Sequence, residues 1–383
     1  MIFVRLRIFV ILLSALCFAV VSKKKIAKTD TVAIIQMAKL GDIICTTPLF
    51  RAVKEKNPHT KVVVIGNTIN KEVVSGNKNI DQYISISRDD SFIKIVKILK
   101  SHHIDAVCIT SPNFELLAAC IISRIPVIVV PRITNGRSPY ETRPYKILRK
   151  FVDTQIHAMG SYAPQEYLRL LEPIGIHSTD THKDIFYTSV SLEKVRTLFN
   201  NAEGARDISM RIGILPGAGN AIKEWAPEKF AQLMNMIAQR GGVVFVLLGT
   251  EKDIEKGKII TDFIGSSVEV INFLDRLTID ELKACISTLD MVIGADTGPI
   301  YIAEALGIPT IDIVGPVDER EQPPMGKIHR IVKVEREGPE LYVMNAREYD
   351  KKEARRQTDD ILPTVVYKEF LDLVEFMSNK IAN

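Results

Sequence analysis

Residues 292–307 read VIGADTGPIYIAEALG, and the fold can be worked out from this stretch. Its apolar start ends in a turn of small residues that includes Asp296 and Thr297, and Pro299 then stands where a first helical residue would be. Proline suits that position because its φ is fixed and it has no N–H to leave unpaired. Apolar side chains recur every three residues from position 300 on, which is helical spacing. The stretch therefore predicts a buried strand, a tight loop and the start of a helix.

The start of that helix has two interpretations. Its free N–H groups and the positive end of its dipole favour an anion, most often a phosphate. Thr297 can add a hydroxyl donor, and Gly298 lets the backbone come close to a ligand. The alternative is an ordinary strand–helix turn in which Asp296 or Thr297 caps the helix. These residues alone leave both interpretations open.

On both sides of this stretch, short apolar runs alternate with amphipathic patterns. In the first half we expect strands at residues 31–36, 62–65, 83–86, 106–109 and 127–130. In the second half we expect them at 211–215, 243–248, 268–271, 291–293 and 310–314. Helical patterns lie between them, and the turn-rich residues 131–144 predict a loop. This alternation predicts an α/β protein with two doubly wound parallel sheets and a cleft between the two domains.

The polar, irregular residues 177–183 mark the start of a linker between the two halves. We expect four segments: residues 1–28 as an N-terminal membrane anchor with a basic flank, 29–185 as a first α/β domain, 186–350 as a second, and 351–383 as a helical tail. The tail includes an amphipathic helix over residues 363–380.

Composition excludes several classes of protein. The net charge of +4 is too mild to indicate a nucleic-acid partner. The five cysteines are scattered and form no Cys-x-x-Cys pair, so neither a zinc site nor a disulfide framework is expected. No Gly-x-Gly-x-x-Gly follows a strand, which disfavours a nicotinamide-dependent oxidoreductase, and no Asp-x-Asp occurs.

The N-terminus is strongly apolar, since residues 8–21 contain Ser14 as their one polar residue. A helix of this length covers about 20 Å, less than the roughly 30 Å of a bilayer's hydrocarbon core. A cleaved signal peptide is disfavoured by the three lysines at 23–25, and a lipoprotein signal ending at Cys17 by the bulky Leu16 before it. We expect an uncleaved anchor, spanning or half-buried, that holds the protein at the cytoplasmic face of the inner membrane.

Three loops that follow predicted strands carry polar or glycine residues, where ligands of parallel sheets bind. The first contains Gly41 and Asp42, and Asp42 is either a helix cap or a general base. The second, residues 216–225, contains Gly217 and Lys223, and the lysine is either solvated or paired with a phosphate. In the third, Glu251 is either a capping acid or an acceptor for ribose hydroxyls.

A basic region follows in the first half, and it comprises Arg132, Arg137, Arg143, Lys146, Arg149 and Lys150. One interpretation is a solvated surface. The other is a binding site for an acidic saccharide or for anionic lipid headgroups. His157, a lone histidine in an amphipathic stretch, is expected to be structural.

Three motifs together resemble the bacterial glycosyltransferase family nine, the lipopolysaccharide heptosyltransferases. They are KLGDIICTTPL at 39–49, LPGA at 215–218 with KEWAPEKF at 223–230, and DTGP at 296–299 followed by AEALGIP at 303–309 and Gly315-Pro316. The resemblance covers nearly all of the chain after Thr31. It implies two Rossmann-like domains in the glycosyltransferase B fold.

The resemblance also implies a function. A nucleotide-activated sugar, typically ADP-heptose, is expected on the C-terminal half, and a lipid-linked or acidic saccharide acceptor on the N-terminal half. Transfer is expected to proceed with inversion and with neither a cofactor nor a metal ion. Asp42 matches the proposed base. The implied donor-side residues are Gly217, Lys223, Glu251, Asp296, Thr297, Gly298, Pro299 and Tyr301, and those on the acceptor side are Gly41, Thr46, Arg132, Arg137 and Arg143.

One residue departs from the family pattern. The family usually has histidine where this chain has Tyr301, and tyrosine donates a hydrogen bond but carries no positive charge near pH 7. This difference leaves two alternatives open. One is a different sugar nucleotide on the same fold, used for capsule or surface polysaccharide. The other is an inactive, membrane-tethered protein that binds sugar nucleotides.

Overall fold

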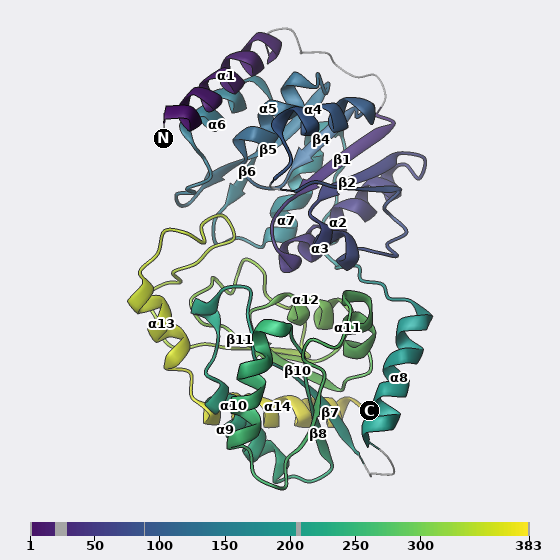
Figure 1. Cartoon of the computed structure of the whole chain (residues 1–383), viewed down its shortest axis with the longest axis vertical. Coiled ribbons are helices and arrows are strands. Elements are labelled where there is room, and N and C mark those ends of the chain that lie inside the picture. Colours follow the sequence, from purple (N-terminus) through teal and green to yellow (C-terminus); the bar gives the residue numbers. More distant parts are fainter. Residues whose placement is uncertain (1, 20–28, 88, 204–207, 382–383) are drawn as a thin grey trace. The chain divides into compact units, whose positions relative to one another are not determined.

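A computed structural model describes residues 2–19, 29–87, 89–203 and 208–381 (Figure 1). The chain divides into two compact units: Met1–Lys183 with Tyr342–Glu348 form unit 1, and Asp184–Leu341 with Tyr349–Asn383 form unit 2. The main chain therefore passes between the units three times. The returning segment Tyr342–Glu348 belongs to unit 1, where the guanidinium of Arg347 lies 4.9 Å from the centre of the Tyr140 ring.

Unit 1 is built on one parallel sheet of six strands in the order β3-β2-β1-β4-β5-β6. The strands are β1 (Thr31–Gln36), β2 (Lys61–Gly66), β3 (Gln82–Ser85), β4 (Ala106–Ile109), β5 (Val127–Thr134) and β6 (Asp153–Ala158). The central strands are buried along nearly their whole length, as a sheet with both faces covered requires.

Helices cover both faces of this sheet (Figure 1). The core on one face is shared by α1 (Ile2–Ala19), α4 (Phe92–Ser101), α5 (Phe114–Ile122) and α6 (Arg143–Leu148). The other face carries α2 (Leu40–Lys56) and α7 (Ala163–Leu168), which pack against each other, and the short α3 (Thr68–Val73) contacts α2.

Unit 2 repeats the plan, with strand order β12-β11-β10-β7-β8-β9 and every pair parallel. Its strands are β7 (Met210–Leu215), β8 (Val243–Leu247), β9 (Glu269–Asn272), β10 (Met291–Ala295), β11 (Thr310–Ile313) and β12 (His329–Val332). In each unit the first strand lies beside the fourth, so both sheets have the same doubly wound order. This order confirms the predicted α/β fold and its two parallel sheets.

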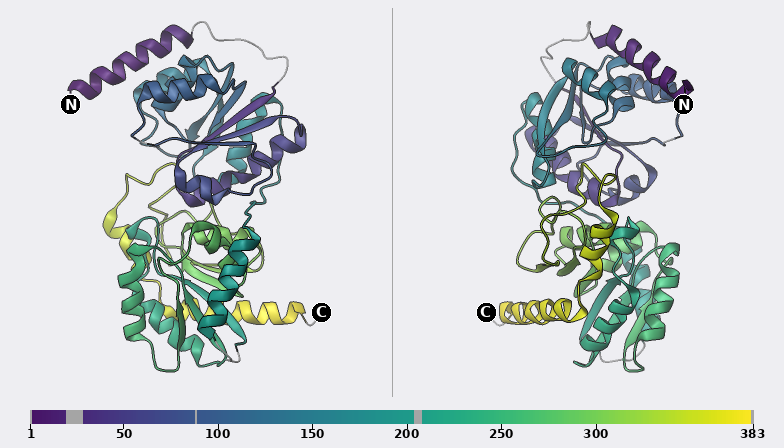
Figure 2. Two further views of the ribbon diagram at one scale, coloured as in Figure 1. Left: turned by 45° about the vertical axis from the view of Figure 1, so that its right-hand side comes forward. Right: turned by 90° about the vertical axis from the view of Figure 1, so that its left-hand side faces the viewer.

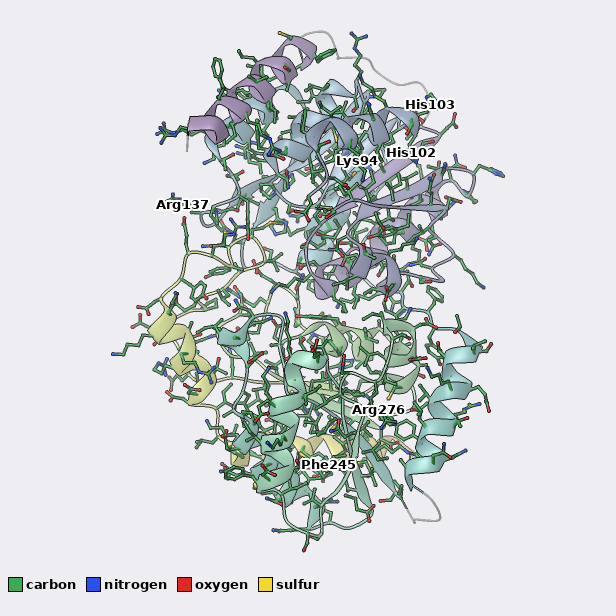
Figure 3. All side chains as sticks on the ribbon, in the orientation of Figure 1. Lys94, His102, His103, Arg137, Phe245 and Arg276 are labelled. Atoms are coloured by element: carbon green, nitrogen blue, oxygen red, sulfur yellow. The ribbon has the colours of Figure 1, made fainter. Side chains whose placement is uncertain are left out.

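The helices of unit 2 also lie in two layers. One core is shared by α9 (Pro227–Ala238), α10 (Ile254–Phe263) and the long straight α14 (Pro363–Ile381), seen side-on in Figure 2. Phe245 of β8, labelled in Figure 3, belongs to this core. On the other side α11 (Ile279–Ile286) contacts both α8 (Ser189–Glu203) and α12 (Gly298–Ala305). A further helix, α13 (Lys351–Asp359), precedes α14.

The structure corrects the sequence prediction in three places. Residues 131–144 are not wholly a loop, because β5 continues to Thr134 and pairs with β6 from Val129↔Asp153 to Thr134↔Ala158. Strands β6 and β12 were not predicted, and neither were α8 and α13 as separate helices. Edge strands and polar helices such as these carry little apolar periodicity of their own.

The N-terminal segment forms a helix that packs on unit 1. Ile11, Ala15 and Ala19 of α1 are buried in the same core as α5 and α6. Within the described part of the chain, no helix combines the length and the apolar content needed to cross a bilayer. The predicted spanning anchor is therefore not supported, while the half-buried alternative stays a prediction. The predicted basic flank at 23–25 lies outside the described residues.

Candidate functional site

The strand order places two loops of unit 2 beside each other. β7 and β10 are neighbours where the order reverses, and ligands of doubly wound sheets bind outside the carboxyl ends of strands at this point. The loop after β7 carries Gly217 and Lys223, and the loop after β10 carries Asp296 and Thr297. The strands thus bring together most of the donor-side residues expected from the sequence.

Lys223 and Asp296 form an ion pair between the two loops. The Lys223 Nζ donates to the Asp296 carbonyl oxygen at 2.6 Å and to its Oδ2 at 2.5 Å. The two side chains are 15% and 14% exposed, so the pair is largely shielded from water but still reachable. One ammonium group is therefore fixed beside the start of α12.

Tyr301 completes this arrangement from inside α12. Its side chain is 3% exposed, and its hydroxyl donates to Asp296 Oδ1. Asp296 consequently accepts from Lys223 with one carboxylate oxygen and from Tyr301 with the other. The structure directs the Tyr301 hydroxyl at Asp296, so the hydrogen bond that the tyrosine donates goes to this carboxylate.

The first turn of α12 has the features of an anion site. Thr297 has extended backbone geometry at the N-cap position, and its side chain makes no capping hydrogen bond. Gly298 and Pro299 open the helix, and both are half-buried. The strand–loop–helix prediction for this stretch is confirmed. The uncapped hydroxyl and the first-turn N–H groups suit a phosphate better than they suit a self-capped turn.

Asp312 lies behind this cluster and was missed by the sequence reasoning. It sits on β11 opposite Gly294 of β10, is 1% exposed, and its Oδ1 has no hydrogen-bond partner among the described residues. Burial raises the pKa of Asp312 well above its usual range, and Asp296 adds to the rise while Lys223 opposes it. The sequence did contain a signal for this residue, since Asp312 is an acid within the apolar run of a predicted buried strand.

Gly217 lies against the side chain of Asp253. A Cβ on Gly217 would collide with the Asp253 carboxylate, so a larger residue requires Asp253 to shift. Asp253 accepts from the Thr250 N–H at 2.9 Å and from Lys256 Nζ at 2.9 Å. Burial raises the pKa of this carboxyl, but the Lys256 and Thr250 hydrogen bonds outweigh it and the net pKa is lowered. Glu251, the expected ribose acceptor, is exposed at the start of the same turn.

The loop after β7 is also held from the C-terminal side by groups that the sequence reasoning did not assign. The Trp225 Nε1 donates to the Ile361 carbonyl at 3.0 Å, and the Thr358 hydroxyl donates to the Ile222 carbonyl at 3.1 Å. Arg355 of α13 donates to the Glu224 carbonyl at 3.0 Å. The predicted helical tail thus supports the loop that carries Lys223.

In unit 1 the corresponding loop leaves β1, which lies beside β4 where that sheet's order reverses. Asp42 lies in the first turn of α2, and its Oδ2 accepts from the Lys39 N–H at 3.1 Å. The capping interpretation is therefore correct for one oxygen of Asp42. A carboxylate that accepts a capping hydrogen bond can still take up a proton, so the structure leaves the proposed base role open.

A buried polar network supports this loop. The Thr46 hydroxyl donates to the Asp42 carbonyl at 2.7 Å and accepts from Gln36 Nε2 at 3.1 Å. Asn70 donates to the Ala38 carbonyl at 3.1 Å. Thr46 is fully buried and Gly41 is also buried, so Thr46 supports the loop in this structure, and contact of either residue with an acceptor stays a prediction.

The three arginines expected on the acceptor side are all exposed. Arg132 lies on β5, Arg137 in the following loop, where Figure 3 shows it reaching outward, and Arg143 at the start of α6. Each is without an acidic partner among the described residues, whereas Arg149 and Lys146 approach Glu141. These three arginines present uncompensated positive charge.

Comparison with known proteins identifies the family of this chain. The model for glycosyltransferase family 9 (heptosyltransferase) matches residues 95–349. Lipopolysaccharide heptosyltransferase 3 of Escherichia coli is 23% identical over 291 residues, which is 73% of this chain and 81% of that protein.

Two solved structures are similar to the chain in fold. The ADP-heptose LPS heptosyltransferase II of E. coli has a TM-score of 0.71 at 17% identity and covers 91% of this chain and 99% of its own. The E. coli heptosyltransferase WaaC with ADP-2-deoxy-2-fluoro heptose has a TM-score of 0.60 at 17% identity, covering 89% and 99%. The three motifs each follow the carboxyl end of a strand. Since the family match spans about two thirds of the sequence, this chain belongs to glycosyltransferase family 9, the heptosyltransferases.

Proposed function

We propose that this glycosyltransferase moves a heptose from ADP-heptose to a lipid-linked acceptor of the lipopolysaccharide-core type, with inversion at the anomeric carbon. The observation that carries the proposal is the position of Lys223 beside the uncapped start of α12, at the reversal point of the unit 2 sheet. A related structure that holds an ADP-sugar analogue supports the choice of donor.

In this mechanism unit 2 stabilises the leaving group. The bond from the anomeric carbon to the diphosphate oxygen breaks, and ADP leaves with the bonding electrons. The negative charge of ADP would be stabilised by Lys223, the Thr297 hydroxyl and the first-turn N–H groups of α12. In enzymes with an Asp-x-Asp motif, a metal ion stabilises this charge. Asp296 would hold Lys223 in place through both of its contacts.

Unit 1 would supply the base. The acceptor hydroxyl attacks the anomeric carbon from the side opposite the leaving diphosphate, and Asp42 takes its proton. Such a base typically contributes about 10²–10⁴ in rate. The exposed Arg132, Arg137 and Arg143 would attract an acidic acceptor.

The base is tested with Asp42→Asn, which keeps an oxygen to accept from the Lys39 N–H and so preserves the cap. We expect an unchanged dissociation constant for ADP and a loss of transfer within the range given above. Asp89→Asn, at an exposed acid of the same unit, is the control and should transfer at the wild-type rate. Full transfer by Asp42→Asn would remove Asp42 from the mechanism.

The donor site is tested by calorimetric titration of ADP in the presence of a chelator. Lys223→Ala should weaken ADP binding at least tenfold, about 1.4 kcal/mol, because a charge-assisted contact is lost. Lys258→Ala, at an exposed lysine of α10, is the matched control. Equal affinities in all three proteins would refute the donor role of Lys223. A panel of ADP-, UDP- and GDP-sugars offered to the wild-type enzyme tests the choice of nucleotide.

We further propose that the enzyme works at the cytoplasmic face of the inner membrane, where a lipid-linked acceptor of this type would be presented. Nucleotide binding without turnover on any acceptor would instead favour the inactive, membrane-tethered alternative, in which Tyr301 replaces the family histidine.

A further inference from the structure

The N-terminal helix α1 has two apolar sides, and the protein covers one of them. Ile11, Ala15 and Ala19 are buried in the core that α1 shares with α5 and α6. The opposite side is formed by Leu6, Phe9, Val10 and Leu13, which are 56%, 55%, 53% and 47% exposed. We call these four residues the outer stripe.

The outer stripe follows from helix geometry. Its positions are spaced by three or four residues, so all four side chains lie on one side of the helix. The exposed Cys17 continues the same side by one further turn. No charged residue occurs between positions 8 and 19. A helix that is apolar all round is normally buried all round, whereas the described residues of unit 1 cover α1 on one side alone.

The helix lies on the outside of unit 1, against α5 and α6 (Figures 1 and 2). It is held there by more than apolar packing. Arg7 forms an ion pair with Glu115 of α5 at 2.9 Å, and the guanidinium of Arg124 lies 5.2 Å from the centre of the Phe18 ring. The direction of the outer stripe is therefore fixed with respect to unit 1.

Basic residues adjoin the outer stripe. Arg5 of α1 is exposed, and the neighbouring α6 exposes Arg143, Lys146 and the apolar Ile147. Tyr145 and Leu148 of α6 are buried in the same core as α1, so the outer sides of both helices belong to one surface of unit 1. This surface combines large apolar side chains with exposed basic ones, of which Lys146 lies 3.8 Å from Glu141.

We infer that the outer stripe of α1 docks unit 1 onto an anionic lipid bilayer, with the helix lying in the plane of the headgroups. Large apolar side chains on one side of a helix, with arginine and lysine beside them, are the features of interfacial helices. An 18-residue helix is about 27 Å long and would lie along the surface with its outer side submerged. This docking is independent of the sugar nucleotide and of the transfer step.

A second copy of the chain fits the surface less well. Four half-exposed side chains of this size expose on the order of 400 Å² together, about half of what each partner contributes to a stable interface of standard size. Two copies would also bring like charges together, since the exposed Arg5 directly precedes Leu6 of the stripe. An anionic membrane instead complements both the apolar and the basic part.

The test is co-sedimentation of the full chain with vesicles of phosphatidylcholine alone or with 30% phosphatidylglycerol. We expect binding to the anionic vesicles that weakens in high salt, and much weaker binding to the neutral ones. The double variant Phe9→Asp, Leu13→Asp should lose at least tenfold in partition coefficient, and Arg5→Glu with Lys146→Glu should lose the dependence on anionic lipid.

Matched controls use equally exposed apolar residues elsewhere. Ile93 is 66% exposed on α4 and Phe263 is 61% exposed on α10, and Ile93→Asp or Phe263→Asp should bind vesicles as the wild type does. The lysines at 23–25 are present in every variant, so a loss of vesicle binding in the double variant is caused by the change in the outer stripe. An unchanged melting temperature of the double variant shows that the covered side of α1 is intact.

Two results would overturn the inference. One is vesicle binding that the double variant retains. The other is a wild-type dimer in sedimentation velocity that the double variant abolishes, together with no binding to either vesicle. Neither assay contains a sugar donor or an acceptor. The proposed transfer reaction is therefore tested separately, by the Asp42 and Lys223 variants.

Discussion

The stability of unit 1 should fall steeply in mild acid because of one buried histidine. His157 of β6 is 2% exposed, its Nε2 has no hydrogen-bond partner among the described residues, and its ring centre lies 5.8 Å from that of Tyr167. Burial, with a smaller contribution from the charge of Arg169, lowers the pKa of His157 from 6.5 to about 4. The folded unit therefore holds this imidazole neutral at pH values where the unfolded chain protonates it.

The sign and size of the effect follow from linkage between protonation and folding. Because the folded pKa is depressed, the stabilisation is fully present above the unfolded pKa of 6.5 and is lost progressively as the pH falls toward 4. With these two values, the loss between about pH 7.5 and about pH 4.5 is about 2.5 kcal/mol. His157→Phe removes the titration and keeps a ring against Tyr167, so the variant should escape this loss.

The measurement is urea unfolding of wild type and His157→Phe at both pH values, followed by two probes. The chain's single tryptophan, Trp225, is buried in unit 2, so its fluorescence reports unit 2, and circular dichroism reports both units. The two proteins should differ in the pH dependence of the unit 1 transition alone. His59→Phe, at an exposed histidine of unit 1, controls for the loss of a histidine as such.

Identical pH dependence of the unit 1 transition in wild type and His157→Phe would refute this reasoning. It would mean that the imidazole is reached by water or by a hydrogen-bond partner in solution. A difference seen equally in the tryptophan signal would also contradict it, because His157 belongs to the other unit.

Three further predictions concern unit 2. Gly217→Ala should weaken ADP binding at least tenfold in calorimetry, since its Cβ would collide with Asp253, whereas Gly338→Ala, with open space around it, should bind normally. Tyr301→Phe leaves the Oδ1 of Asp296 without its hydroxyl donor and should cost about 1–3 kcal/mol in urea unfolding followed by tryptophan fluorescence; an unchanged midpoint would contradict it. Asp312→Asn should gain stability relative to wild type as the pH rises above 4, because an acid with a raised folded pKa loses stability on the alkaline side; a constant difference between pH 4 and pH 9 would contradict it.

Much of the fold was predictable because its central strands carry uninterrupted apolar runs. The runs at β1, β4, β7 and β10 are buried on both faces, and burial on both faces is what their composition indicates. Edge strand β6 reads DTQIHA and is half-exposed, so its pairing with β5 had no local signal. Helix α13 is almost entirely polar and depends on a cap at Asp350 and on contacts with the loop after β7.

The sequence predicted which loops form the candidate site, but not which side chains in those loops contact one another. Glycines, Lys223 and Asp296 after strand ends indicated a ligand site, and parallel strands place such loops at one edge of the sheet. Lys223 pairs with Asp296, which lies 73 positions further along the chain. Tyr301, five positions after Asp296, donates to the same carboxylate. Both contacts depend on the directions of the side chains, and the spacing of residues in the sequence does not determine those directions.

The brief return of the chain to unit 1 at Tyr342–Glu348 has a consequence for engineering. A gene cut at the junction after Lys183 does not separate the halves cleanly, because the first fragment then lacks the arginine that covers the Tyr140 ring. If the second half is replaced by that of a relative, residues 342–348 are replaced as well. Unit 1 of the chimaera then carries a segment from the other parent. Chimaeras that exchange the second half should keep these seven residues from the parent that supplies the N-terminal half.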